Sequence, residues 1–104
     1  MGHQDVRLTH QTLKVLRIFL ERPNDALAGS DIWQETGIFS GTLYPILARL
    51  EKTGWLTSSW EAAQPSEVGR PRKRLYRLTG VGQQRAQRAF EELLPAQGRL
   101  GWSY

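Results

Sequence analysis

The chain contains 104 residues, of which 39% are hydrophobic and 23% are charged. This length suits one domain, and the composition is that of a folded protein rather than a disordered one. The absence of cysteine excludes disulfide bonds, thiol catalysis and zinc–thiolate sites. The apolar stretches are too short to span a bilayer and the first residues do not resemble a secretory signal, so we expect a cytoplasmic protein with no membrane partner.

Positive charge is concentrated in one segment of the chain. Residues 1–69 contain six Lys or Arg and eight Asp or Glu, whereas residues 70–90 contain seven basic residues and no acidic one. Phosphate contacts and the release of counterions supply most non-specific affinity for nucleic acids. The basic segment therefore predicts binding to a polyanion such as DNA, with a solvated basic surface as the alternative.

The first half of the chain has the periodicity of helices. Apolar residues at helical spacing predict a first helix over residues 9–21, with Thr9 as its N-cap. After a loop, Ser30 is expected to cap a short second helix over residues 30–36. Trp33 is an expected core contact of this second helix.

A third helix is predicted over residues 40–53, following a left-handed turn at Gly37. Ser40 is its expected N-cap. Its apolar positions fall on one face and are Leu43, Ile46, Leu47 and Leu50. Pro45 lies just beyond the first turn and lacks an N–H, so a kinked or tightened helix start is expected there.

The second half of the chain predicts a β-hairpin followed by a helix. Residues 55–61 and 73–78 are rich in β-forming residues, and the second stretch alternates clearly. The connection between them, residues 62–72, contains Pro, Gly, Ser and Arg and is expected to be a flexible protruding loop. Thr79 is the expected N-cap of a last helix, which Pro95 would end.

This order of elements predicts a fold that is mainly α with a small antiparallel β-hairpin. Three helices, a strand, a basic loop, a strand and a final helix form the winged helix-turn-helix arrangement, in which the third helix enters the major groove of DNA. We assign residues 8–78 to a winged-helix DNA-binding domain and residues 79–95 to a dimerisation helix of the same compact unit. Residues 96–104 form a tail without predicted regular structure.

Two long motifs resemble the PadR family of bacterial transcriptional regulators. The first is SGTLYPILARLEKTGWLTSSWE, which starts at Ser40, and the second is GRPRKRLYRLTGVGQQ, which starts at Gly69. The resemblance extends over residues 8–94 and is to the short branch of the family, with a single helix after the wing. Members commonly have a Gly-Tyr pair entering the second helix, where this chain has Gly29 and Ser30.

The resemblance implies a DNA-binding homodimer that represses nearby genes and is released by a small hydrophobic or aromatic effector. It points to Ser40, Thr42, Tyr44 and Pro45 in the third helix and to Gly69, Arg70 and Pro71 in the wing. The chemistry of the residues leads to nearly the same set, because hydroxyl groups and free N–H groups at a helix start suit phosphate oxygens. It adds Gly41 at the helix start, Arg49 as a possible reader of a guanine edge, and Arg72 and Lys73 in the wing.

The last helix has an apolar stripe that could contact a second subunit. The stripe consists of Ala86, Phe90, Leu93 and Leu94. In a dimer, each subunit would place residues 40–53 in successive major grooves of a pseudo-palindromic operator. The same apolar residues could instead fold back on their own domain.

Several residues have a second interpretation. Tyr44 is adjacent to the apolar stripe of the third helix and could be a core residue rather than a DNA contact. Arg74 and Arg77 could form the solvated face of a strand, and Arg85 and Arg88 could serve solubility or the rim of a dimer. Trp33, Trp55 and Trp60 suit a core or an aromatic interface.

The sequence contains no pattern of a catalytic, cofactor or metal site. His3 and His10 are isolated and lack metal-ligand spacing, and the Gly80–Gly82 segment falls short of a nucleotide-binding fingerprint. We therefore expect neither an enzyme nor a cofactor. The alternative to a specific regulator is a winged-helix module that binds a protein partner without specific DNA binding.

Overall fold

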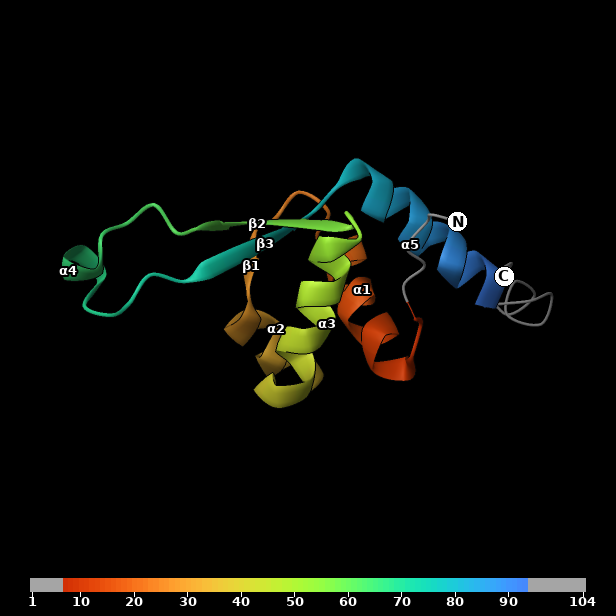
Figure 1. Cartoon of the computed structure of the whole chain (residues 1–104), viewed down its shortest axis with the longest axis horizontal. Helices are drawn as coiled ribbons and strands as arrows, with labels where there is room; N and C mark the ends of the chain where they lie inside the picture. The colour runs from red at the N-terminus through yellow and green to blue at the C-terminus, as the bar shows by residue number, and fades with distance from the viewer. Residues whose placement is uncertain (1–6, 94–104) are drawn as a thin grey trace.

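The computed structural model describes residues 7–93 and has the winged-helix order of elements. The elements are α1 (His10–Glu21), β1 (Leu27–Ala28), α2 (Gly29–Thr36), α3 (Ser40–Lys52), β2 (Leu56–Trp60), α4 (Pro65–Val68), β3 (Arg74–Leu78) and α5 (Gly80–Leu93). In Figure 1, helices α1 to α3 form the body below the sheet, and the wing between β2 and β3 extends to one side. The predicted fold class is confirmed. The expected helix end at Pro95 and the tail lie outside the described residues.

The sheet has three strands rather than the two of the predicted hairpin. All pairs are antiparallel, in the order β1-β3-β2. In β1, Leu27 pairs with Tyr76 and Ala28 with Leu75. This strand could not be predicted from the sequence, because a two-residue segment has no visible alternation and its extended conformation depends on the edge that β3 offers it.

Two predicted helix caps are wrong, although Thr9 caps α1 as predicted. Helix α2 begins one residue earlier than expected, with Ala28 as its N-cap. The carboxylate of Asp31, in the first turn, accepts the backbone N–H of Ala28 at 2.9 Å, so the side-chain hydrogen bond at this helix start comes from Asp31 and not from Ser30. Ser30 is instead an exposed helical residue.

The turn between α2 and α3 determines where α3 begins. Gly37 has a φ of 73° and ends α2 in the left-handed region, as predicted. Ile38 is buried, and Phe39 takes the N-cap position in an extended conformation, so Ser40 is already helical and is not the cap. The carbonyl of Phe39 accepts the N–H groups of Thr42 and Leu43 at 2.9 and 2.8 Å.

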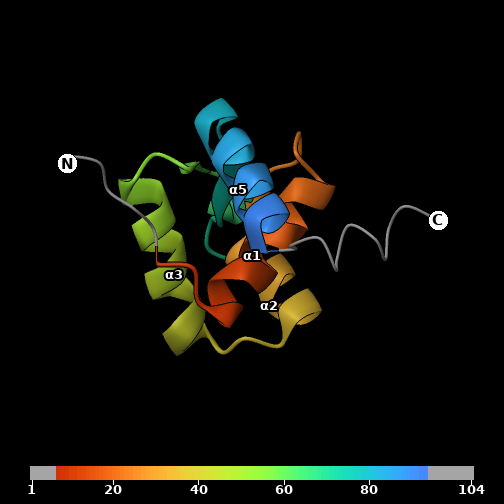
Figure 2. The same cartoon turned by 90° about the vertical axis from the view of Figure 1, so that its right-hand side faces the viewer.

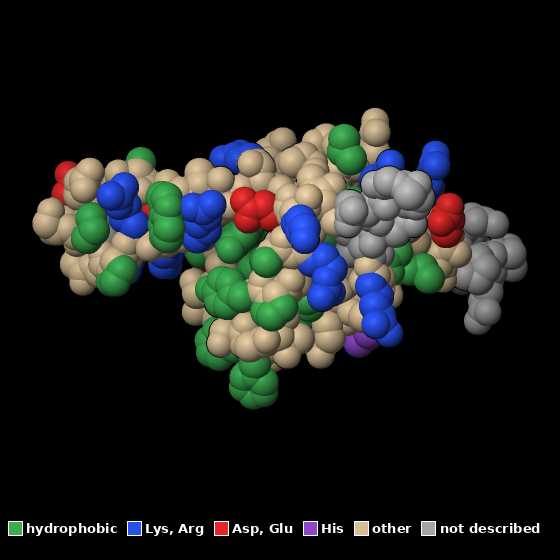
Figure 3. All heavy atoms as spheres, viewed as in Figure 1, with side chains coloured by type: hydrophobic (Ala, Val, Ile, Leu, Met, Phe, Trp, Pro, Cys, Tyr) green, Lys and Arg blue, Asp and Glu red, His purple; other side chains and the backbone are tan. Residues whose placement is uncertain are grey.

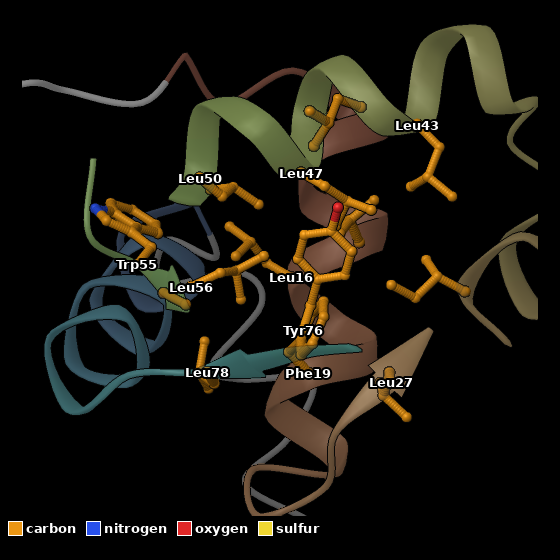
Figure 4. Packing of buried hydrophobic residues seen from close by; sticks show 14 of the residues in the cluster. Leu16, Phe19, Leu27, Leu43, Leu47, Leu50, Trp55, Leu56, Tyr76 and Leu78 are labelled. Atoms are coloured by element: carbon orange, nitrogen blue, oxygen red, sulfur yellow. The ribbon is translucent and has the colours of Figure 1, made fainter. Parts of the chain in front are cut away.

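The core lies between α1, α3 and the sheet (Figure 4). Its largest fully buried side chains include Leu16, Phe19, Leu43, Leu47 and Leu50. The four apolar positions predicted for α3 are all buried. Trp33 was expected in this core but is 45% exposed, because the short helix α2 buries the side of Ile32 and turns the next residue outward.

The wing is longer and more regular than the flexible loop that the sequence predicted. It contains the single-turn helix α4, with Pro65 at its first position and Gly69, at a φ of 71°, as its C-cap. The carboxylate of Glu67 accepts the backbone N–H of Gln64 at 2.8 Å. Local capping thus forms a helical turn at the wing tip that periodicity could not show in four residues.

Helix α5 returns from the sheet and packs beside α1 (Figure 2). Thr79 caps it as predicted, since its hydroxyl oxygen accepts the N–H of Gly82 at 2.9 Å. The same hydroxyl lies 2.6 Å from the carbonyl oxygen of Gly54, which ties the start of α5 to the end of α3. None of the helices within residues 7–93 has the length and apolar character needed to cross a membrane.

Candidate nucleic-acid interface

Helix α3 exposes the face opposite its buried stripe. The predicted contact residues Ser40, Gly41, Thr42, Tyr44, Pro45 and Arg49 are all exposed, and so is Ala48. Tyr44 is 45% exposed, so it lies on the surface rather than in the core. The structure therefore places the six residues predicted for this helix on one accessible side of the helix-turn-helix unit.

A hollow in the corner between α2, α3 and the wing brings the recognition helix and the basic segment together. It has a volume of about 310 Å³. Its lining, called the basic corner below, consists of Ala28, Gly29, Ser30, Tyr44, Arg72, Lys73 and Arg74. Three of the seven residues are cationic and none is acidic. The corner also includes the first two residues of α2, where the helix dipole is positive and the backbone N–H groups have no partner within the helix.

The basic residues of the wing are not equivalent. Arg70 binds Glu61 with two hydrogen bonds, from Nη1 to Oε1 at 2.7 Å and from Nη2 to Oε2 at 3.0 Å. These bonds lower the pKa of Glu61 from 4.5 to about 2 and raise the pKa of Arg70. Among the described residues, no salt bridge includes Arg72 or Lys73. The charge of Arg70 is therefore neutralised within the wing, whereas Arg72 and Lys73 keep theirs.

Arg74 connects the wing with the end of α3. Its Nε donates to the hydroxyl of Ser58 at 3.0 Å, and that hydroxyl donates in turn to Glu51. The guanidinium lies 4.9 Å from the ring centroid of Trp60, its partner across β2 and β3. This half-buried arrangement is not that of a solvated strand face. Arg77 lies on the opposite face and donates to the carbonyl of Asn24 at 2.9 Å.

Exposed aromatic side chains gather at the turn of the helix-turn-helix unit. Figure 3 shows hydrophobic side chains at the lower edge of the molecule, and Lys and Arg side chains along the wing. A second hollow, of about 330 Å³ and called the aromatic hollow below, is lined by Gly29, Ser30, Trp33, Phe39, Ser40, Leu43 and Tyr44. Phe39 is 77% exposed. Phe39 is not among the residues predicted for the site, although alternation with the buried Ile38 in an extended link would have placed it outward.

The part of the chain that the structure describes has no group of three or more His, Asp or Glu side chains arranged to hold a metal ion. The chemistry available at the basic corner is therefore that of cations, hydroxyl groups and a helix N-terminus. Such groups bind phosphate oxygens.

Comparison with protein families decides the relationship that the motifs indicated. The model described as the transcriptional regulator PadR-like family matches residues 29–88, more than half of the chain. The chain belongs to this PadR-like family. The matched segment begins with α2 and includes α3, the wing and most of α5.

Solved structures similar to this PadR-like chain have the same fold. A transcriptional regulator homologue from Pyrococcus horikoshii OT3 superposes with a TM-score of 0.70 at 19% identity, over 86% of this chain and 82% of that one. The protein smu.1704 from Streptococcus mutans UA159 gives 0.65 at 28% identity, over 86% and 85% of the two chains. Comparison with curated proteins gives no significant match.

The structure of reduced AbfR bound to DNA is also similar, and AbfR is a protein of Staphylococcus epidermidis. It superposes with a TM-score of 0.65 at 26% identity, over 81% of this chain and 56% of AbfR. This PadR-like chain therefore spans little more than half the length of AbfR.

The four residues predicted for dimerisation lie in different environments in this PadR-like chain. Ala86 is fully buried in the chain's own core, and Phe90 packs partly against that core. Leu93 is 50% exposed. Leu94 lies outside the described residues. Of the described three, Leu93 offers the most exposed apolar surface for a partner.

Proposed function

We propose that this chain is a sequence-specific DNA-binding transcriptional regulator. Helix α3 enters the major groove and the wing follows the neighbouring phosphate backbone. The observation that supports this most strongly is the basic corner, in which Tyr44 of α3 and the wing residues Arg72 and Lys73 line one hollow. A duplex held by α3 would bring its phosphates to these cations.

The contacts of the proposed interface follow from the chemistry of its residues. Ser40 and Thr42 at the start of α3 and Ser30 at the start of α2 offer hydroxyl and N–H groups to phosphate oxygens. Arg49, exposed farther along α3, suits the O6 and N7 acceptors of guanine. Arg72 and Lys73 act through charge and carry no sequence information. Gly69 and the exposed Pro71 shape the wing beside Arg70.

The DNA-bound structure of AbfR supports this proposal, since AbfR is 26% identical to the chain and has a TM-score of 0.65. A regulatory rather than a catalytic role also fits the PadR-like family.

We further propose that the regulator is a homodimer whose α5 helices pack together through Leu93 and Phe90. Two α3 helices would then read half-sites about one helical turn, roughly 34 Å, apart in a pseudo-palindromic operator. By analogy with other members of its family, the dimer represses nearby genes and releases DNA when a small hydrophobic or aromatic effector binds between the subunits.

Fluorescence anisotropy at physiological salt tests the proposed function. The DNA immediately upstream of the chain's own gene is compared with scrambled DNA of equal length. Binding of the natural fragment at least ~1000-fold more tightly is the expected result. Equal and weak binding of this and of other genomic fragments would contradict it and favour a module that binds a protein partner.

Sedimentation equilibrium tests the dimer separately. Wild-type protein is expected to sediment as a dimer, and Leu93→Glu to weaken it because an unpaired carboxylate would be buried at the interface. Gln84→Glu, which adds the same charge at an exposed position of the same helix, is the matched control. A monomeric wild-type protein would contradict the dimer and leave the DNA-binding proposal to its own test.

A further inference from the structure

The exposed side of the recognition helix has few groups that can hydrogen-bond to base edges. Residues 39–50 contain no Asn, Gln, Lys, Asp, Glu or His, and Arg49 is their only charged residue. Direct readout by hydrogen bonds relies largely on Arg, Lys, Asn, Gln and acidic side chains. Within residues 39–50, hydrogen bonding to bases beyond the hydroxyl groups of Ser40, Thr42 and Tyr44 therefore rests on Arg49 alone.

Exposed apolar residues lie instead at the N-cap of α3 and along one face of the helix. Phe39 is 77% exposed, and the exposed residues Gly41, Pro45 and Ala48 follow one another along one helix face at spacings of four and three. Gly41 has no side chain, and the space next to it is open, so a groove wall can approach the backbone closely. In the major groove, the apolar group that distinguishes one base from the others is the C5-methyl of thymine.

The aromatic hollow adjoins the basic corner, so one ligand can cover both. Both hollows are lined by Gly29, Ser30 and Tyr44. One duplex can therefore place phosphates against Arg72 and Lys73 while its major-groove edge covers the apolar side of α3. Neither hollow has an acidic side chain in its lining that would repel the phosphates.

We propose that Phe39, Pro45 and Ala48 read thymine methyl groups, so that the specificity of this chain rests mainly on apolar contacts at A·T pairs. This inference rests on the proposed function, because it assigns the base-reading chemistry of the same interface. Arg49 supplies the hydrogen-bonded contact, and Tyr44 lies between the apolar side and the basic corner.

Deoxyuridine substitution tests the inference. The part of the operator that the bound protein protects is first found by footprinting. Each thymine in this protected part is then replaced in turn by deoxyuridine, which removes one methyl group and leaves the base pairing unchanged. At the thymines that α3 contacts, affinity is expected to fall about fourfold per methyl, the equivalent of one buried methylene group. Thymines outside the protected region serve as the internal control and should show no change.

Variants of Phe39 connect the effect with the aromatic hollow. Phe39→Ser is expected to abolish the deoxyuridine effect at one thymine of each half-site, whereas Phe39→Leu, which keeps an apolar side chain, should preserve it. Folding should survive both changes, since Phe39 caps α3 through its backbone carbonyl and buries little of its ring. Val81→Ala, at an exposed apolar residue of α5, is the control for a general loss of apolar surface.

The outcomes separate this inference from the proposed function. Specific binding that is unaffected by deoxyuridine at every protected thymine overturns the inference and leaves the regulator intact. Full deoxyuridine sensitivity in Phe39→Ser also overturns it. If Phe39→Ser changes only the self-association of the protein and leaves DNA binding unaltered, the aromatic hollow binds a second copy of the chain, and the inference is contradicted as well. Absence of any sequence-specific binding overturns the proposed function itself.

Discussion

The phenol ring of Tyr44 on α3 lies directly over the α-carbon of Gly29, the first residue of α2. A Cβ atom at position 29 would overlap the hydroxyl oxygen and lie only 2.6 Å from Cζ of the ring. The absence of a side chain at Gly29 thus allows the ring to lie between the aromatic hollow and the basic corner.

Gly29→Ala is therefore expected to displace Tyr44 and to weaken DNA binding by ~1 kcal/mol, the value of one hydrogen bond. The fold should remain, because the obstacle is the end of a 45%-exposed side chain rather than backbone. Anisotropy and thermal melting measure the two effects. In a Tyr44→Ala background, Gly29→Ala should cost nothing further. If Gly29→Ala lowered DNA affinity equally in the Tyr44→Ala background, its effect would not depend on displacement of the Tyr44 ring.

Gly82→Ala is expected to destabilise the protein by about 2 kcal/mol or more, because the new methyl group would meet rigid backbone. A Cβ at Gly82 would lie 2.7 Å from the carbonyl carbon of Trp55. Gly80, two residues earlier in the same helix, has open space at its Cβ position, so Gly80→Ala should leave stability unchanged or slightly raised. Urea denaturation compares the two variants, and similar midpoints would contradict the close packing of α5 on the start of β2.

Arg72 and Lys73 are expected to contribute more to DNA binding than Arg70. Replacing either with Ala should lower affinity for all sequences and reduce the slope of log affinity against log salt by about 0.9 for each lost phosphate contact. Arg70→Ala should change the slope less, because Glu61 already neutralises the guanidinium. Salt titrations of binding measure the slopes. A larger effect for Arg70 would mean that its ion pair opens when DNA binds.

The ion pair between Glu61 and Arg70 is expected to persist at mildly acidic pH. Since the pKa of Glu61 falls from 4.5 to about 2 in the folded chain, its contribution to wing stability is complete above pH 4.5 and is lost as the pH falls through about 2. The carboxyl carbon shift of Glu61, followed by NMR, measures this titration. Arg70→Gln should return the midpoint toward 4.5, and an unchanged midpoint in that variant would assign the shift to another group.

Much of the helical body was predictable because its determinants are local. The apolar stripe of α3, the left-handed Gly37 and the cap at Thr79 depend on neighbours within a few residues, and all three agree with the structure. The incorrect cap predictions at Ser30 and Ser40 also come from local sequence alone. Serine is a good cap by propensity, but Asp31 caps α2 from inside its first turn, and burial of Ile38 sets the start of α3.

The candidate site was only partly accessible to sequence reasoning. The sequence identifies the basic segment and the start of α3, but it gives no reason to distinguish Arg70 from Arg72 as DNA contacts. Only the folded wing shows that the carboxylate of Glu61, nine residues before Arg70, pairs with the Arg70 guanidinium. The aromatic hollow was likewise missed, because Trp33 was assigned to the core from its type rather than from the side of α2 on which it lies.

The sequence by itself determined the order of the four long helices and the two hairpin strands, the apolar faces of the helices, the position of the basic segment and the PadR-like relationship, because each depends on residue types at short spacing. The tertiary structure decided which charges remain unpaired, where β1 pairs, and that α2, Tyr44 and the wing enclose one basic corner. These features depend on contacts between segments far apart in the chain, such as Leu27 with Tyr76 and Glu51 with Arg74. Their geometry is fixed only when burial of the shared core brings the segments together.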